Sequence, residues 1–276
     1  MVKFASGNEA RQTITEIVNM VKRKLNMPII PTSPNLPPGS ELTVLHAPGY
    51  EGKITRGRDD NKGFSRLALF DTIFVIDDTG SMQVAAHSSE PAARGRKTRW
   101  DVLTRSMQYI GNIAAEYDPD GVDILFLIST HLNKTNIKSG QEVLNLLAQV
   151  DLEEGSGGTY FATVLAEILG PYVARYQDYF EATKRREKAD KVRPLNVILL
   201  TDGKADDAKS TKKTIIKIGK QLDKMNAPDT QIGLQFLQVG DDEDAAKWLK
   251  SLDNDLEAEH DVRDVSQCPA HFLAWI

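Results

Sequence analysis

Three side chains that carry oxygen alternate along one short segment, TIFVIDDTGSM at residues 72–82. They are Asp77, Thr79 and Ser81. The four residues before them, 73–76, are apolar without polar alternation, which predicts a strand buried on both faces. Gly80 permits a tight turn that can bring the three oxygens to one spot, and hard cations such as Mg²⁺ prefer oxygen ligands. The same residue types also form turns and cap helices, so this segment alone fits both structures equally well.

A second apolar run, NVILLTD at residues 196–202, also ends in a carboxylate, Asp202, and is followed by Gly203. Between the two runs lies GSGGT at residues 155–159, which places Thr159 at a loop-to-helix junction. Ligands of open α/β sheets bind at the carboxyl ends of strands, where loops converge. Taken alone, Thr159 would serve equally as a helix N-cap, and the glycines as a phosphate cradle or a source of simple flexibility.

Together these residues resemble the metal-ion-dependent adhesion site (MIDAS) of von Willebrand factor A (VWA) domains. The family pattern is D-x-S-x-S, then a threonine after a glycine-rich turn, then an aspartate that closes a central strand. Thr79 replaces the first serine and keeps its hydroxyl. The resemblance spans roughly residues 69–264 and includes RW at 99–100, YDPDGVDI around Asp118 and LQVGDD around Gly240. Within the family, the chain is most similar to intracellular members of the kind common in fungi.

The resemblance implies a non-catalytic protein-interaction domain that requires Mg²⁺, with Mn²⁺ as a substitute. The implied metal ligands are Asp77, Thr79, Ser81, Thr159 and Asp202. Neutral hydroxyl ligands, with an aspartate bound through water, would leave the cation electrophilic. In the family, a Glu or Asp of the bound protein then fills the remaining position, and the threonine enters or leaves the shell as the domain changes conformation. No histidine adjoins the five positions to act as a base, so the expected role of the metal is to bridge two proteins.

An enzyme is the second interpretation of the same carboxylate. Phosphatases of the haloacid-dehalogenase type also place a nucleophilic aspartate after their first strand and use Mg²⁺, and Asp77 would be that nucleophile. Their pattern is D-x-D-x-T, however, whereas Thr79 occupies the position of the acid/base partner here. A third interpretation, a degenerate scaffold without metal, is disfavoured by five intact oxygen ligands.

The segments that must position these residues alternate between strand and helix patterns. Strands are predicted at 72–77, 122–129, 195–201 and 231–239. Apolar residues recur at helical spacing in 100–114, 143–147, 164–169 and 215–222. This alternation predicts an α/β fold, a three-layer α/β/α open sheet of mostly parallel strands that is Rossmann-like. The charged run at 183–193 is expected to be a solvated loop.

Three regions are predicted along the chain. Residues 1–27 form an amphipathic helical extension, residues 28–66 a Pro-rich linker with an irregular segment, and residues 67–276 a VWA domain with an altered C-terminal end. That altered end, CPAHFLAWI, stands where the family continues into a long helix, which puts allosteric switching in question. Its apolar side chains would pack or bind a partner.

An insertion at residues 83–98 separates the metal motif from the RW pair. Its cations Arg94, Arg96 and Lys97 could select an acidic partner, or the segment could act as a lid or a disordered polar loop. His87 within it is either an extra ligand or a solvated side chain.

Composition limits the environment and the partners. A net charge of −5 over 276 residues argues against nucleic acid as the principal partner. The single cysteine, Cys268, cannot form an intramolecular disulfide, which favours a reducing compartment. No apolar segment approaches about 18 residues, so no membrane span is expected. The first residues lack a signal-peptide hydrophobic block, so the expected location is the cytoplasm, with the nucleus as an alternative.

Overall fold

A computed structural model describes residues 42–43, 53–54, 70–86, 97–117, 120–153, 157–260 and 266–267. The predicted N-terminal helix, the Pro-rich linker, most of the insertion and the C-terminal end lie outside the described residues. Two short antiparallel strands, β1 (Leu42–Thr43) and β2 (Lys53–Ile54), lie in the region that was predicted to be a linker with an irregular segment.

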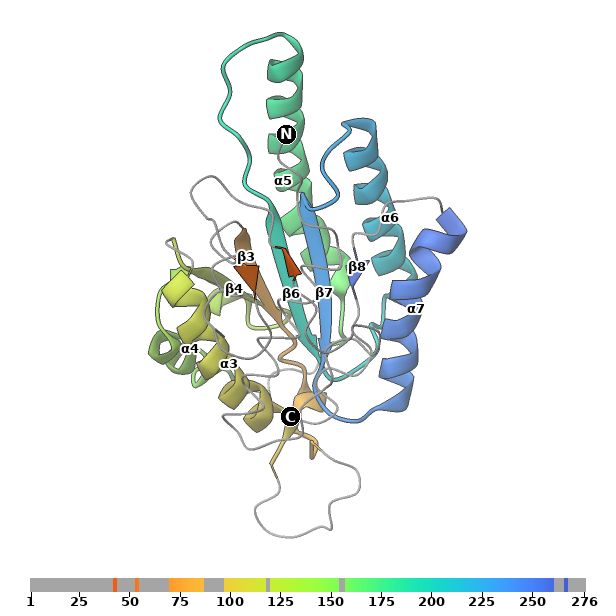
Figure 1. The fold of residues 1–276 in the computed structure, drawn as a ribbon. Coiled ribbons are helices and arrows are strands. Elements are labelled where there is room, and N and C mark those ends of the chain that lie inside the picture. The colour runs from red at the N-terminus through yellow and green to blue at the C-terminus, as the bar shows by residue number, and fades with distance from the viewer. Residues whose placement is uncertain are drawn as a thin grey trace.

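The centre of the molecule is a six-stranded sheet with the order β5-β4-β3-β6-β7-β8 (Figure 1). Its strands are β3 (Asp71–Ile76), β4 (Val122–Phe126), β5 (Lys134–Ile137), β6 (Leu195–Thr201), β7 (Ile232–Gln238) and β8 (Ser266–Gln267). Every neighbouring pair is parallel except β4 and β5. The strand pattern therefore predicted the sheet type correctly.

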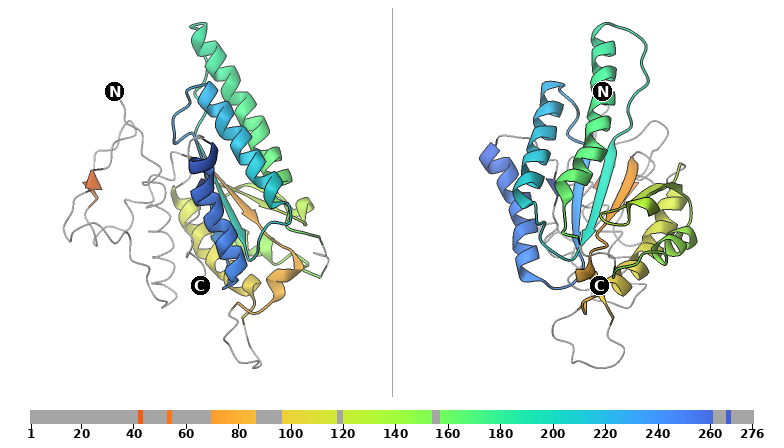
Figure 2. Two further views of the ribbon diagram at one scale, coloured as in Figure 1. Left: turned by 90° about the vertical axis from the view of Figure 1, so that its right-hand side faces the viewer. Right: turned by 180° about the vertical axis from the view of Figure 1, so that it is seen from behind.

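Helices cover both faces of this sheet and make three layers (Figures 1 and 2). They are α3 (Arg99–Tyr117), α4 (Gly140–Leu147), α5 (Phe161–Lys184), α6 (Ala208–Lys224) and α7 (Glu243–His260). One hydrophobic core joins α3 and α4 to the sheet, and a second joins α5, α6 and α7 to its other face. The α/β, three-layer prediction is confirmed. Within the described residues, none of the helices has the length and apolarity needed to cross a bilayer.

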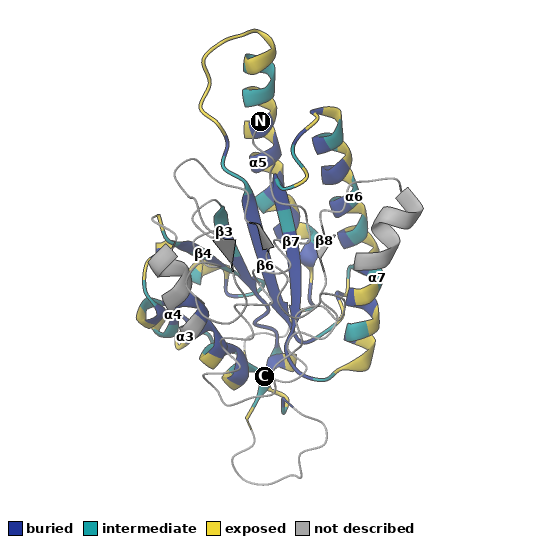
Figure 3. Ribbon diagram, in the orientation of Figure 1, coloured by how far each residue is buried: buried dark blue, intermediate teal, exposed yellow. Residues whose placement is uncertain are grey.

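Strands β3 and β6 lie side by side at the centre of the sheet, and both end in buried residues (Figure 3). All seven residues of β6 are buried, because helices cover both of its faces. In the parallel register Ile76 is opposite Leu200, so the two strands end at the same level. The residues that follow them in sequence are therefore brought together at one edge.

The structure differs from the sequence predictions at β4, β5, α7 and residue 193. Strand β4 ends at Phe126 rather than at residue 129, because the N–H groups of Ile128 and Ser129 bind a side chain at the site described below. Strand β5 was not predicted, and neither was α7, whose Trp248 packs against Phe161 and Phe236 at ring distances of 6.1 and 5.9 Å. The charged loop is exposed as expected from residue 183 to residue 191. Arg193, however, pairs with Asp71 and Asp120.

Candidate metal centre

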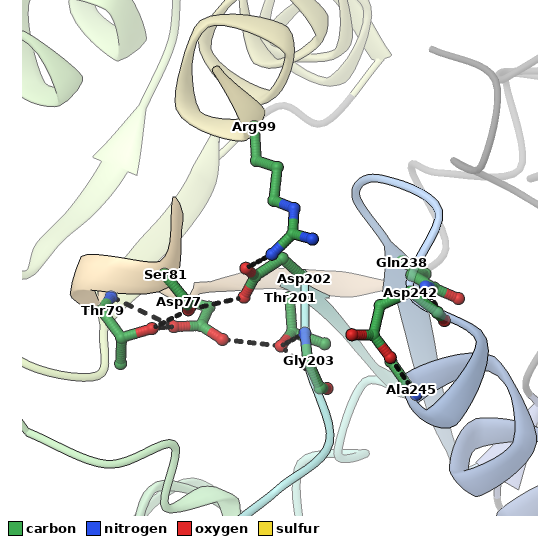
Figure 4. A network of polar contacts seen from close by, with 10 residues as sticks. All are labelled: Asp77, Thr79, Ser81, Arg99, Thr201, Asp202, Gly203, Gln238, Asp242 and Ala245. Carbon is green, nitrogen blue, oxygen red and sulfur yellow. Dashed lines mark hydrogen bonds and ion pairs between the residues drawn. The ribbon is translucent and has the colours of Figure 1, made fainter. Parts of the chain in front are cut away.

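Two carboxylates meet at the carboxyl ends of the central strands (Figure 4). Asp77 is the first residue after β3, and Asp202 is the first after β6. The backbone N–H of Asp77 donates to the carbonyl of Leu200 at 2.9 Å, which extends the pairing of β3 and β6 by one residue. Both side chains are removed from water, at 0% exposure for Asp77 and 1% for Asp202.

Two hydroxyls connect these carboxylates in a continuous chain. The Oγ1 of Thr79 donates to Oδ1 of Asp77 at 2.7 Å and lies 3.0 Å from the Oγ of Ser81. The Ser81 hydroxyl donates to Oδ1 of Asp202, also at 3.0 Å. Four of the five residues predicted from sequence are thus brought into direct contact, although 121 residues separate Ser81 from Asp202.

Local chemistry explains the shape of the first loop. Asp77 Oδ1 accepts the backbone N–H of Thr79 at 3.1 Å, the kind of local turn that aspartate favours. A short 3-10 helix, Gly80–Gln83, follows and buries Met82 completely. With Met82 buried in this way, Ser81 is the exposed member of the cluster and Thr79 is buried. The cluster therefore has one side that faces solvent.

The oxygen spacing fits a small divalent cation. Mg²⁺ holds oxygen ligands at about 2.0–2.1 Å in an octahedron, so neighbouring ligand oxygens lie about 2.9 Å apart. The three successive oxygen pairs of the chain are separated by 2.7, 3.0 and 3.0 Å. Among the described residues, no group of three or more His, Cys, Asp or Glu side chains could hold a metal. A metal here would therefore depend on the hydroxyls as well as on the two carboxylates.

The electrostatics of Asp77 also suit a bound cation. Burial raises its pKa to about 6, hydrogen bonds from Thr201 and Thr79 oppose that rise, and the charge of Asp202 adds to it. Within the described part of the chain, the contacts of Asp77 are made with hydroxyls and amides and include no cationic side chain. A cation beside this carboxylate would favour its ionised form.

Among the described residues, Thr159 is bonded to the loop after β6 and has no hydrogen bond to the other four predicted ligands. Its N–H donates to Oδ2 of Asp206 at 2.7 Å, and its carbonyl accepts the N–H of Asp206 at 3.0 Å. Among the residues described, no hydrogen bond joins the Thr159 hydroxyl to the oxygen chain. A Cβ on Gly158 would lie 2.6 Å from Asp206 Oδ2, so this glycine allows the carboxylate to approach.

Thr159 is not the N-cap of the following helix either. The N-cap of α5 is Tyr160, which makes no side-chain capping bond. Asp207 caps the helix from a different loop and accepts the N–H groups of Phe161 and Ala162 at 3.2 and 2.9 Å. Asp206 and Asp207 together thus fasten the loop after β6 to the start of α5.

Sequence reasoning missed two further residues of the cluster. The Thr201 hydroxyl donates to Oδ2 of Asp77 at 2.6 Å, and an Nη1 hydrogen of Arg99 is donated to Oδ2 of Asp202 in a close ion pair. The signal for Thr201 is a hydroxyl residue that ends an otherwise apolar buried strand. Arg99 belongs to the RW pair, but no pattern in the sequence assigns it a partner 103 residues away.

Asp78 has a separate, structural role. Its two carboxylate oxygens accept the backbone N–H groups of Ile128 and Ser129, each at 2.8 Å. These bonds turn the chain away from the sheet after β4, which explains why the strand is shorter than predicted. Asp78 therefore connects the loop after β3 to the loop after β4.

The two ends of the insertion lie together beside the cluster. Ala85 and Thr98 form an antiparallel bridge, and the N–H of Ala86 donates to the carbonyl of Lys97 at 3.0 Å. Lys97 is exposed. Arg94, Arg96 and His87 lie outside the described residues, so their predicted roles remain predictions.

Comparisons with known proteins add little to this geometry. No protein-family model matches the chain, and no curated protein matches it. Among solved structures, the crystal structure of manganese-loaded Plasmodium vivax TRAP protein is similar at 12% sequence identity, over 76% of this chain and 75% of that chain, with a TM-score of 0.38. A likeness this distant carries no functional conclusion.

Proposed function

We propose that this chain is a non-catalytic protein-interaction domain of the VWA type that binds a partner through a divalent cation. The cation, Mg²⁺ or Mn²⁺, would be held by the MIDAS-type residues, and an aspartate or glutamate of the partner would complete its shell. The proposed ligands are Asp77, Thr79, Ser81, Thr159 and Asp202. The observation that carries the proposal is the unbroken chain of oxygens from Asp77 to Asp202 at the adjoining ends of β3 and β6.

The donor set suits recruitment of an acidic group. Three hydroxyls and two carboxylates are hard oxygen donors, and the hydroxyls, with an aspartate bound through water, would leave a divalent cation electrophilic. A bound cation would supply positive charge at the solvent-facing side of the cluster. Ser81 is the exposed ligand, so a partner carboxylate would approach next to it.

Thr159 remains in the proposed ligand set because its backbone is bonded to Asp206, four residues after Asp202. Its side chain is 7% exposed and belongs to the same edge of the sheet. A small movement of the loop that contains Asp206 would change its distance from the cluster. We therefore assign it the variable position that the family resemblance implies.

Isothermal titration of the chelator-treated protein with Mn²⁺ and Mg²⁺ tests the metal site. We expect saturable binding by the wild type, loss of binding in Asp77→Asn and Asp202→Asn, and unchanged binding in Asp178→Asn, which alters an exposed carboxylate on α5. A wild type that binds neither metal would refute the proposal. Equal binding by all three variants would refute the ligand assignment.

A partner assay tests the second half of the proposal. Immobilised wild-type protein should retain a protein partner from its native source in Mg²⁺ and release it in chelator. The Asp202→Asn protein should retain none under either condition, and neutralising one acidic residue of the identified partner should abolish binding.

The phosphatase interpretation is tested in parallel. Asp77 has 0% exposure, and within the described residues its carboxylate is bonded to hydroxyls and an amide, so no observation favours it as a nucleophile. Aryl-phosphate hydrolysis with a panel of divalent metals should give no turnover. Turnover that disappears in Asp77→Asn would replace the binding proposal with an enzymatic one.

A further inference from the structure

Arg99, the first residue of α3, lies across the candidate metal centre (Figure 4). Its guanidinium forms a close ion pair with Oδ2 of Asp202, while Oδ1 of the same carboxylate accepts the Ser81 hydroxyl. The side chain of Arg99 is 13% exposed and that of Asp202 is 1% exposed. Both oxygens of one proposed metal ligand are therefore already engaged, one of them by a positive charge.

Two loops besides the one that carries Asp202 hold Arg99 in this position. Its backbone N–H donates to the carbonyl of Val84 at 2.9 Å, at the neck of the insertion. Its side chain lies against Gly240, which follows β7 and has a φ of +96°. A Cβ at Gly240 would lie 2.9 Å from Arg99 Nε, so a larger residue there would displace the guanidinium.

The guanidinium is held at this location by a single polar contact. Within the described residues, its Nε is buried and has no hydrogen-bond partner, and its ion pair with Asp202 is the one polar bond of its side chain that the structure gives. An arginine has five N–H donors, and the described part of the chain provides an acceptor for one of them. The position is thus maintained by the charge of Asp202 and would be weakened by any other cation at that carboxylate.

Among the described residues, one of the two carboxylates of the cluster has a cationic partner. Asp202 is paired with Arg99, whereas Asp77 is surrounded by hydroxyl and amide donors. A divalent cation that bridges the two would meet the guanidinium at Asp202. Two cations at one carboxylate repel each other strongly when water is excluded.

We propose that Arg99 is a resident counter-ion that competes with the divalent cation for Asp202 and so sets the metal affinity of the site. This inference rests on the proposed function. In the metal-free protein the guanidinium neutralises Asp202 through Oδ2, and a cation held at Oδ1 of the same carboxylate must compete with it for that charge. The competition keeps affinity low enough for occupancy to respond to the metal concentration and to the arrival of an acidic partner.

Metal titration of charge-neutral variants tests the competition. In Arg99→Gln we expect the Kd for Mn²⁺ to fall about tenfold, because a unit charge next to the cation is removed. The matched control is Arg105→Gln, which removes an exposed arginine one and a half turns further along α3 and should leave Kd within about twofold. An unchanged or higher Kd in Arg99→Gln, with normal binding by the wild type, would overturn this inference and leave the proposed function intact. Absence of binding by the wild type would overturn both.

A measurement on the wild type covers the case in which Arg99→Gln does not fold. The arginine Nε–H resonance that is missing in Arg99→Lys identifies Arg99 in ¹⁵N spectra. We expect this resonance to shift when the chelator-treated protein is saturated with Mg²⁺, since the cation competes with the guanidinium for the charge of Asp202. A resonance that stays in place at saturating Mg²⁺ would show that Arg99 and the metal do not compete.

Discussion

Asp77 is a carboxylate whose protonation should control the stability of the metal-free protein. Its pKa is raised to about 6, mainly by burial, from an ordinary value of 3.8. The folded state therefore holds this proton more tightly than the unfolded chain does. The resulting stabilisation is fully present below pH 3.8 and is lost as the pH rises through about 6.

The raised pKa of Asp77 makes the stability of the metal-free protein depend on pH. In chelator, the free energy of unfolding of the wild type relative to Asp77→Asn should be about 1 kcal/mol greater at pH 5 than at pH 7.5. Urea denaturation at the two pH values, followed by circular dichroism, gives the comparison. If the free energy of unfolding changed between the two pH values by the same amount in the wild type and in Asp77→Asn, the raised pKa would be contradicted.

Thr201 is the hydroxyl that supports Asp77 from β6. Replacement by valine keeps the shape of the buried side chain and removes the 2.6 Å bond to Oδ2. Because the acceptor is a buried carboxylate, Thr201→Val should lower the free energy of unfolding by about 2 kcal/mol at pH 7.5 in chelator. The control is Thr183→Val, whose exposed hydroxyl bonds a carbonyl of its own helix and whose loss should cost less than about 0.5 kcal/mol. If the free energy of unfolding fell by the same amount in the two variants, the Thr201 hydroxyl would contribute no more to stability than the exposed hydroxyl of Thr183.

Four of the residues that the sequence proposed as metal ligands are brought into contact by the structure. Asp77, Thr79 and Ser81 follow from alternate spacing after an apolar run, and Asp202 follows from the same strand ending. Arg99 and Thr201 were not predicted, because each acts through one contact across more than 100 residues. Such a contact depends on the strand register, which no local pattern encodes.

At the scale of elements, α5 is a helix whose N-terminus is completed by another loop. Asp207 accepts two N–H groups of its first turn, and its charge lies at the positive end of the helix dipole. Asp207→Ala should therefore lower the free energy of unfolding by about 1–2 kcal/mol. Asp178→Ala, in the exposed middle of α5, is the control and should change it by less than about 0.5 kcal/mol. Urea denaturation measures both, and a similar small loss in each variant would show that the cap contributes little.

Strands β5 and β4 were misjudged for different physical reasons. Three of the four residues of β5 are exposed, so the strand has almost no hydrophobic pattern and depends on its pairing with β4. Apolar residues continue past Phe126, yet β4 stops there because Asp78 binds the N–H groups of Ile128 and Ser129. Strands β3 and β6 were located within one residue, since burial on both faces gives an unambiguous apolar run.

At the scale of the whole molecule, side chains fasten the central strands at both ends. At the amino ends, Arg193 bonds both oxygens of Asp120 at 2.7 and 2.6 Å and the carbonyl of Phe70 at 3.0 Å. At the carboxyl ends, the oxygen chain from Asp77 to Asp202 joins β3 to β6. A ligand at the second end would stabilise the contact between two strands that belong to both hydrophobic cores.

Metal binding should therefore raise the stability of the folded chain as a whole. At a metal concentration 100 times Kd, the gain is about 2.7 kcal/mol, which corresponds to a rise in Tm of about 5–10 °C for a domain of this size. Differential scanning calorimetry of the wild type in chelator and in excess Mn²⁺ should show this rise. Asp178→Asn should behave like the wild type, whereas Asp77→Asn and Asp202→Asn should show no shift. A Tm rise of the same size in Asp202→Asn would mean that Mn²⁺ stabilises the chain from another location, because a cation held between β3 and β6 cannot do without both carboxylates.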